Sequence, residues 1–348
     1  MMQKNPQENV SLASLTTFRI GGEARFLWRA ASIASLREGI SFAAEKKLPF
    51  FVLGGGSNIL ASDGSFAGIV IRMEIRGVEF RELPHDEAEA RVGAGENWDE
   101  FVAEAVKRGF CGVENLSLIP GTVGAAPVQN IGAYGVEAAQ SIISVETFDP
   151  RTMKVETLMN ADCRFGYRDS IFKRPEGRHL IITEVTFRLR KNAKLHTDYK
   201  DIQKYFADRS ISSPSVAEVR DAVIAIRTAK LPDVSKLGTA GSFFKNPIIE
   251  KSLLNELLKS FPLLPSFPVE SGEENKAKVP AAWILDNLCG FRGYRSGSIG
   301  TYERQALVLV NFGGGTEASI MELAARMQAC VREKTGIELE LEVVRLGN

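Results

Sequence analysis

The chain has 348 residues, 44% hydrophobic and 25% charged, a composition that can bury a sizeable core and suits two or three domains. Its 43 basic residues balance 43 acidic ones, so no net field draws it toward nucleic acid or anionic lipid. The three histidines are isolated from one another, which disfavours a histidine-based metal site or nucleophile. We therefore expect local binding sites, no metal and no nucleic-acid partner.

The cysteines are scattered and form no C-x-x-C pair, so neither a structural zinc site nor a disulfide framework is expected. They are Cys111, Cys163, Cys289 and Cys330. The N-terminus lacks the apolar core of a signal peptide, and no later stretch approaches the roughly 20 apolar residues of a membrane helix. The sequence thus predicts a cytoplasmic protein without membrane insertion.

The first elements surround a glycine-rich segment. Apolar residues at helical spacing predict a helix from Ser32 to about Lys46. The apolar run 50–53 predicts a buried strand that feeds the loop 54–58, GGGSN. Residues 69–71 predict another strand, so the loop lies among short strands and a helix.

The middle of the chain is predicted to be mostly sheet, with strands at 143–148 and 180–189. Before them, Asn97 can cap a helix over 98–106. The run 120–135, PGTVGAAPVQNIGAYG, is too rich in glycine and proline for a long regular element and too apolar for a disordered linker. We expect it to pack against the rest of the fold.

Four helices and a closing strand are predicted in the last part of the chain. A capping box opens a helix at Ser215 that ends near Lys230, and further helices are expected at 250–261, 279–288 and 316–334. The segment 337–343 alternates apolar residues with glutamates. This alternation predicts a closing strand that carries Glu338, Glu340 and Glu342 on one face.

The two glycine-rich runs indicate a cofactor. A strand that runs into GGGSN can present consecutive N–H groups to a pyrophosphate, although a tight turn is the ordinary alternative. The second run, 121–135, favours the cofactor because two such loops can close over both ends of a dinucleotide. Neither G-x-G-x-x-G nor the P-loop pattern is present, which leaves a flavin as the natural candidate.

Three polar groups are candidates for chemistry. The segment 164–170, RFGYRDS, gathers two guanidiniums that could bind an anion, with Asp169 orienting one of them; a solvated turn is the alternative. Ser242 lies on a glycine loop and could donate a proton, or could belong to a buried turn beside Phe243 and Phe244. No neighbouring histidine suggests hydrolysis. Glu342 on an alternating strand would ordinarily face solvent.

Seven segments, taken in order, resemble one family. They are GGGSN at Gly54, GAGENW at Gly93, ENLSLIPGTVGAAPVQNIGAYG at Glu114, CRFGYRDSIF at Cys163, RTAKLPD at Arg227, AGSFFKNP at Ala240 and the terminal ELEV. From about Thr17 to Gly347 the chain resembles the UDP-N-acetylmuramate dehydrogenase family, also called UDP-N-acetylenolpyruvoylglucosamine reductase (MurB), in its larger subclass with a tyrosine loop.

The resemblance implies an α+β fold with a two-subdomain FAD-binding region of vanillyl-alcohol-oxidase type and a C-terminal α+β substrate-binding domain. The implied bounds are 1–72, joined by the strand 336–348, then 73–231, then 232–335. It also implies that NADPH reduces FAD, which passes hydride from N5 to C3 of UDP-N-acetylglucosamine enolpyruvate. A proton then adds at C2 to give UDP-N-acetylmuramate for peptidoglycan synthesis. A monomer is expected, with the UDP-sugar and NADPH as its partners.

Site residues follow from the matching positions. Arg168 would stabilise the enolate that forms at C2, Ser242 would donate the proton, and Glu342 would assist. Leu341 stands where relatives commonly have proline, so Glu340 is a rival for the last role. Contacts to the substrate diphosphate are implied for Tyr199, Lys230 and Asn246. Contacts to FAD are implied for Gly54, Gly55, Gly56, Ser57, Asn58, Pro120, Gly121, Gly124, Gln129, Asn130, Gly132 and Tyr134.

Two other functions fit parts of the pattern. One is a different flavoenzyme of this fold, such as an oxidase of a small alcohol or sugar. The other is a catalytically silent flavin-binding or regulatory protein. Ser242 together with Arg168 argues against both, because oxidases usually need a base and a silent protein needs no proton donor.

Overall fold

The chain folds into two units, each assembled from separate stretches of sequence. The computed structural model describes residues 6–269 and 273–347; the first five residues, part of the N-terminus in which no signal peptide is expected, lie outside this range. The first unit comprises Met1–Val10, Ala24–Gly55 and Ala67–Ala229, and the second comprises Ser11–Glu23, Gly56–Phe66 and Lys230–Asn348. Within the described ranges, no helix is long and apolar enough to cross a membrane.

The first sheet of the first unit is small and partly parallel. Its strand order is β1 (Gln7–Ser11), β2 (Glu23–Ala30), β5 (Phe66–Met73) and β3 (Phe50–Leu53). The predicted helix is confirmed as α1 (Ile33–Glu45), and the side chain of Ser32 caps it by accepting a hydrogen bond from the N–H of Ser35. The prediction that β3 is buried is wrong for most of its length: Leu53 is buried, but Phe50 is 36% exposed, because β3 lies at the edge of the sheet.

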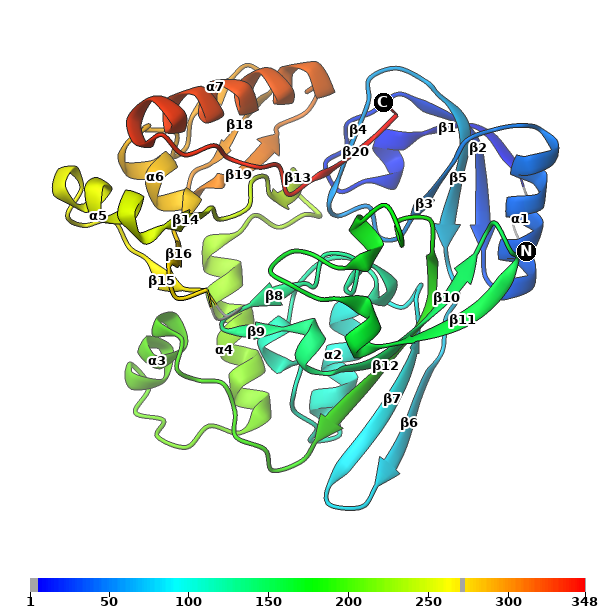
Figure 1. Cartoon of the computed structure of the whole chain (residues 1–348), viewed down its shortest axis with the longest axis horizontal. Helices are drawn as coiled ribbons and strands as arrows, with labels where there is room; N and C mark the ends of the chain where they lie inside the picture. The colour runs from blue at the N-terminus through cyan, green and yellow to red at the C-terminus, as the bar shows by residue number, and fades with distance from the viewer. Residues whose placement is uncertain (1–5, 270–272, 348) are drawn as a thin grey trace. The chain divides into compact units, whose positions relative to one another are not determined.

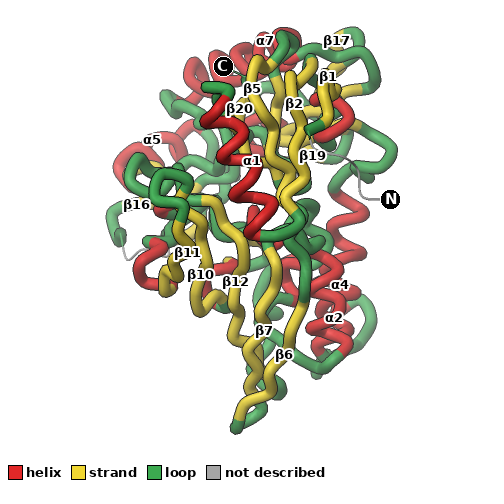
Figure 2. The backbone as a smooth tube through the Cα atoms, turned by 90° about the vertical axis from the view of Figure 1, so that its right-hand side faces the viewer, coloured by secondary structure: helices red, strands yellow, loops and turns green. Residues whose placement is uncertain are grey.

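The larger sheet of the first unit is antiparallel throughout (Figure 2). Its order is β11 (Lys154–Met159), β10 (Ile142–Asp149), β12 (Ile181–Arg190), β7 (Glu87–Gly93) and β6 (Val78–Leu83). Helix α2 (Trp98–Lys107), capped by Asn97 as predicted, packs on it through ring contacts of Trp98 and Phe101 with Phe187. Helices α3 (Lys200–Ala207) and α4 (Val216–Lys230) share a smaller apolar cluster.

The second unit contains two small sheets besides a two-stranded pair that is described below (Figure 1). One has the order β13 (Gly238–Ser242), β19 (Gln305–Asn311), β18 (Ile299–Tyr302) and β17 (Arg295–Ser296), and the other β14 (Ile248–Glu250), β16 (Lys276–Lys278) and β15 (Phe267–Pro268). The three predicted helices are confirmed as α5 (Lys251–Ser260), α6 (Ala281–Asn287) and α7 (Glu317–Thr335). Their apolar faces join one core with β18 and β19.

The end of the chain differs from the prediction. The prediction of a closing strand over 337–343 is wrong, because these residues form no regular strand. The strand at the end of the chain is β20 (Val344–Leu346), which pairs in parallel with β4 (Ile59–Ala61). The predicted alternation survives as burial, since Ile337, Leu339 and Val343 are buried. Regular pairing is missing because the segment makes only an isolated bridge, Leu341 with Phe244.

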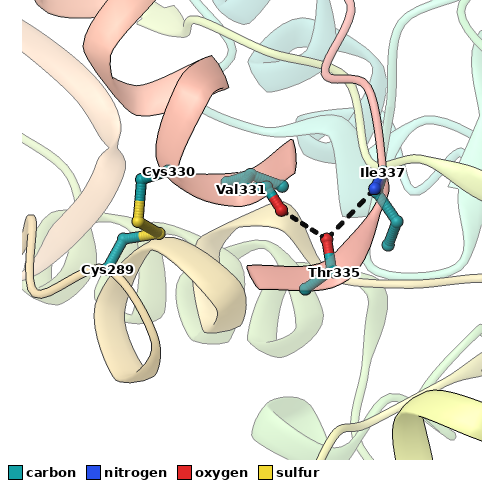
Figure 3. The surroundings of a disulfide bond; sticks show 5 residues. All are labelled: Cys289, Cys330, Val331, Thr335 and Ile337. Carbon is teal, nitrogen blue, oxygen red and sulfur yellow. Dashed lines mark hydrogen bonds between the residues drawn. A yellow bond between two sulfur atoms is a disulfide. The ribbon is translucent and has the colours of Figure 1, made fainter. Parts of the chain in front are cut away.

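A disulfide joins two helices of the second unit. Cys289, just after α6, is bonded to Cys330 on α7, with their Cα atoms 6.0 Å apart, as Figure 3 shows. The scattered cysteines had argued against a disulfide framework, and their spacing did not predict this bond. Their separation of 41 positions is no recognisable spacing, whereas the packing of α6 against α7 brings the two thiols together. Cys111 and Cys163 are buried free thiols.

Candidate functional site

The two glycine-rich runs lie directly against each other in the first unit. A Cβ on Gly55 would approach the Cα of Gly121 to 2.8 Å, and a Cβ on Gly54 would lie 2.5 Å from Thr122 Oγ1. Side chains at these positions would fill the junction, so backbone lines it. The second run is also anchored to the first residue of α2, where the N–H of Trp98 donates to Gly121 O at 3.1 Å. The two loops are therefore in direct contact through their backbones.

Asn58, at the end of GGGSN, fixes the C-terminal segment of the second unit. Its Nδ2 donates to Glu342 O at 3.1 Å, and its own carbonyl accepts from the N–H of Val344 at 3.0 Å. These two bonds hold the backbone on both sides of Val343. The structure therefore gives Asn58 a role in placing Glu342, beside the flavin contact that the family resemblance implies for it.

Asn130 shapes the second glycine-rich run from within. Its Nδ2 donates to Glu137 Oε2 at 2.6 Å and to Gly166 O at 3.1 Å, while its Oδ1 accepts from the N–H of Ala139 at 2.9 Å. The residue is 1% exposed. Its side chain is thus occupied in joining the loop to the segment that carries Arg168.

Arg168 lies against the same loop. Its guanidinium donates to Gly132 O at 2.7 Å and to Asn130 O at 3.3 Å, and its backbone is left-handed at φ 51°. Two backbone carbonyls therefore fix the direction of this cation. The prediction that Asp169 orients Arg164 or Arg168 is wrong: its carboxylate pairs with Arg174 at 2.7 Å, since the tight turn from Gly166 to Asp169 turns it toward the residues that follow.

Two tyrosines meet at the far end of the loop. The rings of Tyr134 and Tyr199 are 5.3 Å apart, edge to face. Asn115 links their segments by donating to Tyr134 O at 3.1 Å and to His196 O at 2.8 Å. A cavity of about 250 Å³ opens here, lined by Tyr134, Gly135, His196, Asp198 and Tyr199. Burial raises the pKa of Tyr134 to about 12, although the nearby charge of Arg227 opposes the shift.

Arg227, on α4, is a residue to which the sequence assigned no role. Its Nε is buried and makes no hydrogen bond among the described residues, and burial lowers its pKa while Tyr134 and Asp99 act in the opposite direction. A buried guanidinium with an unused donor is costly unless an anionic group completes it. This residue, together with the glycine junction, fits a phosphate-bearing or otherwise anionic cofactor. The sequence signal for Arg227 was its place at the start of the segment RTAKLPD.

Ser242 ends strand β13 in the second unit, immediately after Gly241 at φ 76°. Phe243 and Phe244, which follow it, are fully buried, so the aromatic pair is core while the half-buried serine lies at its edge. The C-terminal segment runs antiparallel beside this turn: Lys245 N donates to Glu340 O, and Glu342 N donates to Phe243 O, both at 2.9 Å. The fold therefore brings Ser242 and Glu342 onto neighbouring stretches of backbone.

The two rival glutamates have different surroundings. The Glu340 side chain is 73% exposed and forms an ion pair with Lys245 at 2.8 Å. Glu342 is half-buried, and its backbone is bonded to both Phe243 and Asn58. The backbones of both residues are hydrogen-bonded, so the two carboxylates differ in the greater exposure of Glu340 and in its ion pair with Lys245.

The predicted diphosphate-binding residues lie at ends of helices. Lys230 is the last residue of α4 and is exposed. Asn246 accepts a hydrogen bond of 3.0 Å through Oδ1 from the N–H of Ala281, at the start of α6. This bond occupies the amide oxygen of Asn246 and orients the amide, whose NH₂ group is its donor.

Comparisons with known proteins match two separate regions of the chain. Residues 24–157 match an FAD binding domain, and residues 233–346 match the C-terminal domain of UDP-N-acetylenolpyruvoylglucosamine reductase. Proteins of that name from Chromobacterium violaceum and Pseudomonas aeruginosa are 42% and 43% identical, over 96% and 97% of this chain and 97% of each relative. The solved reductase (MurB) from Thermus caldophilus superposes with a TM-score of 0.67 at 26% identity, covering 98% of this chain and 99% of that one.

The fold and the FAD-binding match define a flavoprotein oxidoreductase with an FAD-binding region followed by a distinct C-terminal domain, which confirms the predicted fold class and cofactor. More particularly, the chain belongs to the UDP-N-acetylenolpyruvoylglucosamine reductase family.

Proposed function

We propose that this chain reduces UDP-N-acetylglucosamine enolpyruvate to UDP-N-acetylmuramate, with FAD as bound cofactor and NADPH as electron source. The observation that carries the proposal is the antiparallel run of Ser242–Lys245 beside Glu340–Glu342, in a chain with the family's two matching domains. The product belongs to peptidoglycan synthesis. We further propose that the protein is a monomer and works in the cytoplasm. We also propose the domain bounds that the sequence predicts, namely 1–72 joined by 336–348, then 73–231, then 232–335.

The reaction requires positive charge and a proton donor. When bound, FAD supplies the hydride that adds to C3 of the enolpyruvyl group. Negative charge then develops at C2 and on the adjacent carboxylate. Arg168 stabilises this charge, a role supported by the two carbonyl bonds that fix its guanidinium.

Ser242 protonates C2. Its O–H bond breaks as the new C–H bond forms, which requires a hydroxyl in a fixed position. The pairing of Ser242 with Val308 in the β13–β19 ladder supplies such a position. Glu342, on the neighbouring segment, assists at the carboxylate end of the substrate, and the exposed, ion-paired Glu340 does not.

Binding is divided among backbone and a few side chains. The two glycine-rich loops hold FAD, supported by the close approach of Gly55 to Gly121 and by the unused Nε of Arg227. The substrate diphosphate is bound by Tyr199, Lys230 and Asn246. The oriented amide of Asn246 and the charge of Lys230 suit that anion.

Anaerobic mixing tests the proposal. The FAD of the full-length protein is reduced with NADPH and then mixed with UDP-N-acetylglucosamine enolpyruvate, and the return of flavin absorbance is followed. We expect rapid reoxidation with authentic substrate and little with UDP-N-acetylglucosamine. Bound FAD that NADPH reduces but this substrate does not reoxidise would contradict the assignment.

A further inference from the structure

A polar network lies under the start of the second glycine-rich run. Asp99 on α2 and Arg220 on α4 form a two-pronged ion pair, with N–O distances of 2.7 and 2.9 Å. The side chain of Arg220 is largely buried. A bidentate pair of this kind fixes the orientation of both side chains in addition to the attraction between their charges.

Both partners also bind the loop itself. Asp99 Oδ1 accepts a hydrogen bond of 2.6 Å from the N–H of Leu118. Arg220 Nη1 donates to Ser117 Oγ at 2.9 Å, and this buried hydroxyl in turn donates to Glu114 O at 2.6 Å. One ion pair therefore holds two consecutive loop residues from two different helices.

The residues held in this way need support. Leu118 adopts φ 59°, a left-handed conformation that is unfavourable for a leucine and persists only when its surroundings impose it. Pro120 and Gly121 follow at once, and the first turn of α2 binds Gly121 O through the N–H of Trp98. The segment that leads into the second glycine-rich run is thus bonded to α2 at Leu118 and again at Gly121.

Asp99 also balances a second charge. Arg227 lies seven residues after Arg220 on α4, two helical turns along the same face, and the charges of Asp99 and Arg227 attract each other. Burial acts to raise the pKa of Asp99, but the hydrogen bonds from Arg220 and Leu118 and the two arginine charges outweigh it and hold this pKa below its usual value. Without Asp99, Arg220 would lose its ion-pair partner and Arg227 would lose an attracting negative charge.

We propose that Asp99 and Arg220 are positioning residues, whose ion pair preforms the loop from Ser117 to Gly124 so that it is ready to bind FAD. This inference rests on the proposed assignment of that loop to FAD. A pair that preforms a binding loop affects the fraction of competent protein, and the apparent dissociation constant rises in inverse proportion to that fraction. Once FAD is bound, its contacts are the same as in the unaltered protein.

The test measures FAD affinity of the full-length chain after its flavin has been removed. Asp99→Asn is compared with Glu104→Gln, a matched control that breaks an exposed ion pair with Arg108 on the same helix. Flavin fluorescence gives the dissociation constant, and the visible spectrum at saturating FAD reports the bound state. Both are read far below the unfolding temperature of the flavin-free protein, where a purely structural loss of stability leaves affinity unchanged.

We expect Asp99→Asn to raise the FAD dissociation constant at least tenfold with an unchanged saturated spectrum, and Glu104→Gln to leave it within twofold. Arg220→Lys, which keeps the charge and loses the fork to Ser117, should weaken binding severalfold, and it serves as the test if Asp99→Asn does not fold. Wild-type affinity in Asp99→Asn, or an equal loss in Glu104→Gln, would overturn the inference. A wild-type chain that fails to bind FAD would instead overturn the proposed function.

Discussion

The backbone N–H of Glu342 donates a 2.9 Å hydrogen bond to the carbonyl of Phe243, the residue that follows Ser242. The proposed proton donor and the proposed carboxylate are 100 positions apart in sequence, and one short antiparallel run holds them both. Neither depends on a flexible loop for its place beside the other. The first two predictions follow from this arrangement.

Glu342→Gln should lower kcat/KM for substrate reduction about 100-fold, within the usual range for loss of an acid–base or polarising group. Glu340→Gln is the matched control, because it removes the neighbouring carboxylate and its ion pair with Lys245. An exposed pair of this kind contributes little, so the control should stay within about threefold. Steady-state kinetics decides between them, and a larger loss in Glu340→Gln would reverse the assignment.

Ser242→Ala should slow flavin reoxidation by substrate by about 100- to 10,000-fold, because proton transfer to C2 loses its donor. Flavin reduction by NADPH involves no such transfer and should keep its rate. Stopped-flow absorbance separates the two half-reactions, with Ser235→Ala, a turn serine bonded to Asp233, as control. Equal slowing of both half-reactions would point to a folding defect and remove the proton-donor role.

Reduction of the Cys289–Cys330 disulfide should lower the free energy of unfolding of the second unit by about 3 to 4 kcal/mol, the loop-closure effect for residues this far apart. Denaturant unfolding with and without dithiothreitol measures the difference. In Cys289→Ser the reductant should have no effect, since the bond is already absent. A wild-type protein whose unfolding is insensitive to reductant contradicts the prediction.

Tyr134 should make stability depend on alkaline pH. Its pKa rises from 10.0 to about 12 in the folded protein, so the unfolded chain loses this proton first. The protonated Tyr134 therefore contributes fully to the free energy of unfolding below pH 10, and this contribution is lost as the pH rises from 10 toward 12. At pH 11 the loss is about 1 kcal/mol. The difference in unfolding free energy between wild type and Tyr134→Phe, measured from pH 8 to pH 11, should shrink by this amount; a constant difference would count against the raised pKa.

Local patterns predicted most of the helices but only some of the strands. The capped starts of α1, α2 and α4 are encoded within four residues of Ser32, Asn97 and Ser215, so sequence alone reveals them. The edge position of β3 could not be predicted, because exposure there depends on which strands pair beyond it. The disulfide was missed for a similar reason, since only the packing of α6 on α7 makes its two cysteines neighbours.

The candidate site likewise has residues that the sequence could predict and contacts that it could not. Ser242, Arg168 and Tyr199 lie in motifs long enough to be matched, but the partners that orient them are carbonyls and helices distant in sequence. The contact of Asp99 with Arg220 spans 121 residues, and neither residue belongs to a recognisable pattern. A glutamate on an alternating segment gives no sign of its surroundings, so Glu342 and Glu340 become distinguishable only through Asn58 and Lys245.

The parallel pairing of β20 with β4 has a consequence for biosynthesis. All residues of the first unit have been translated once the ribosome passes Ala229, whereas the second unit needs Val344–Leu346 to complete its pairing with residues near the start of the chain. A nascent or prematurely terminated polypeptide can therefore contain both glycine-rich loops and still lack the strand that follows Glu342. Synthesis through Leu346 therefore precedes assembly of the segment that holds the proposed catalytic carboxylate.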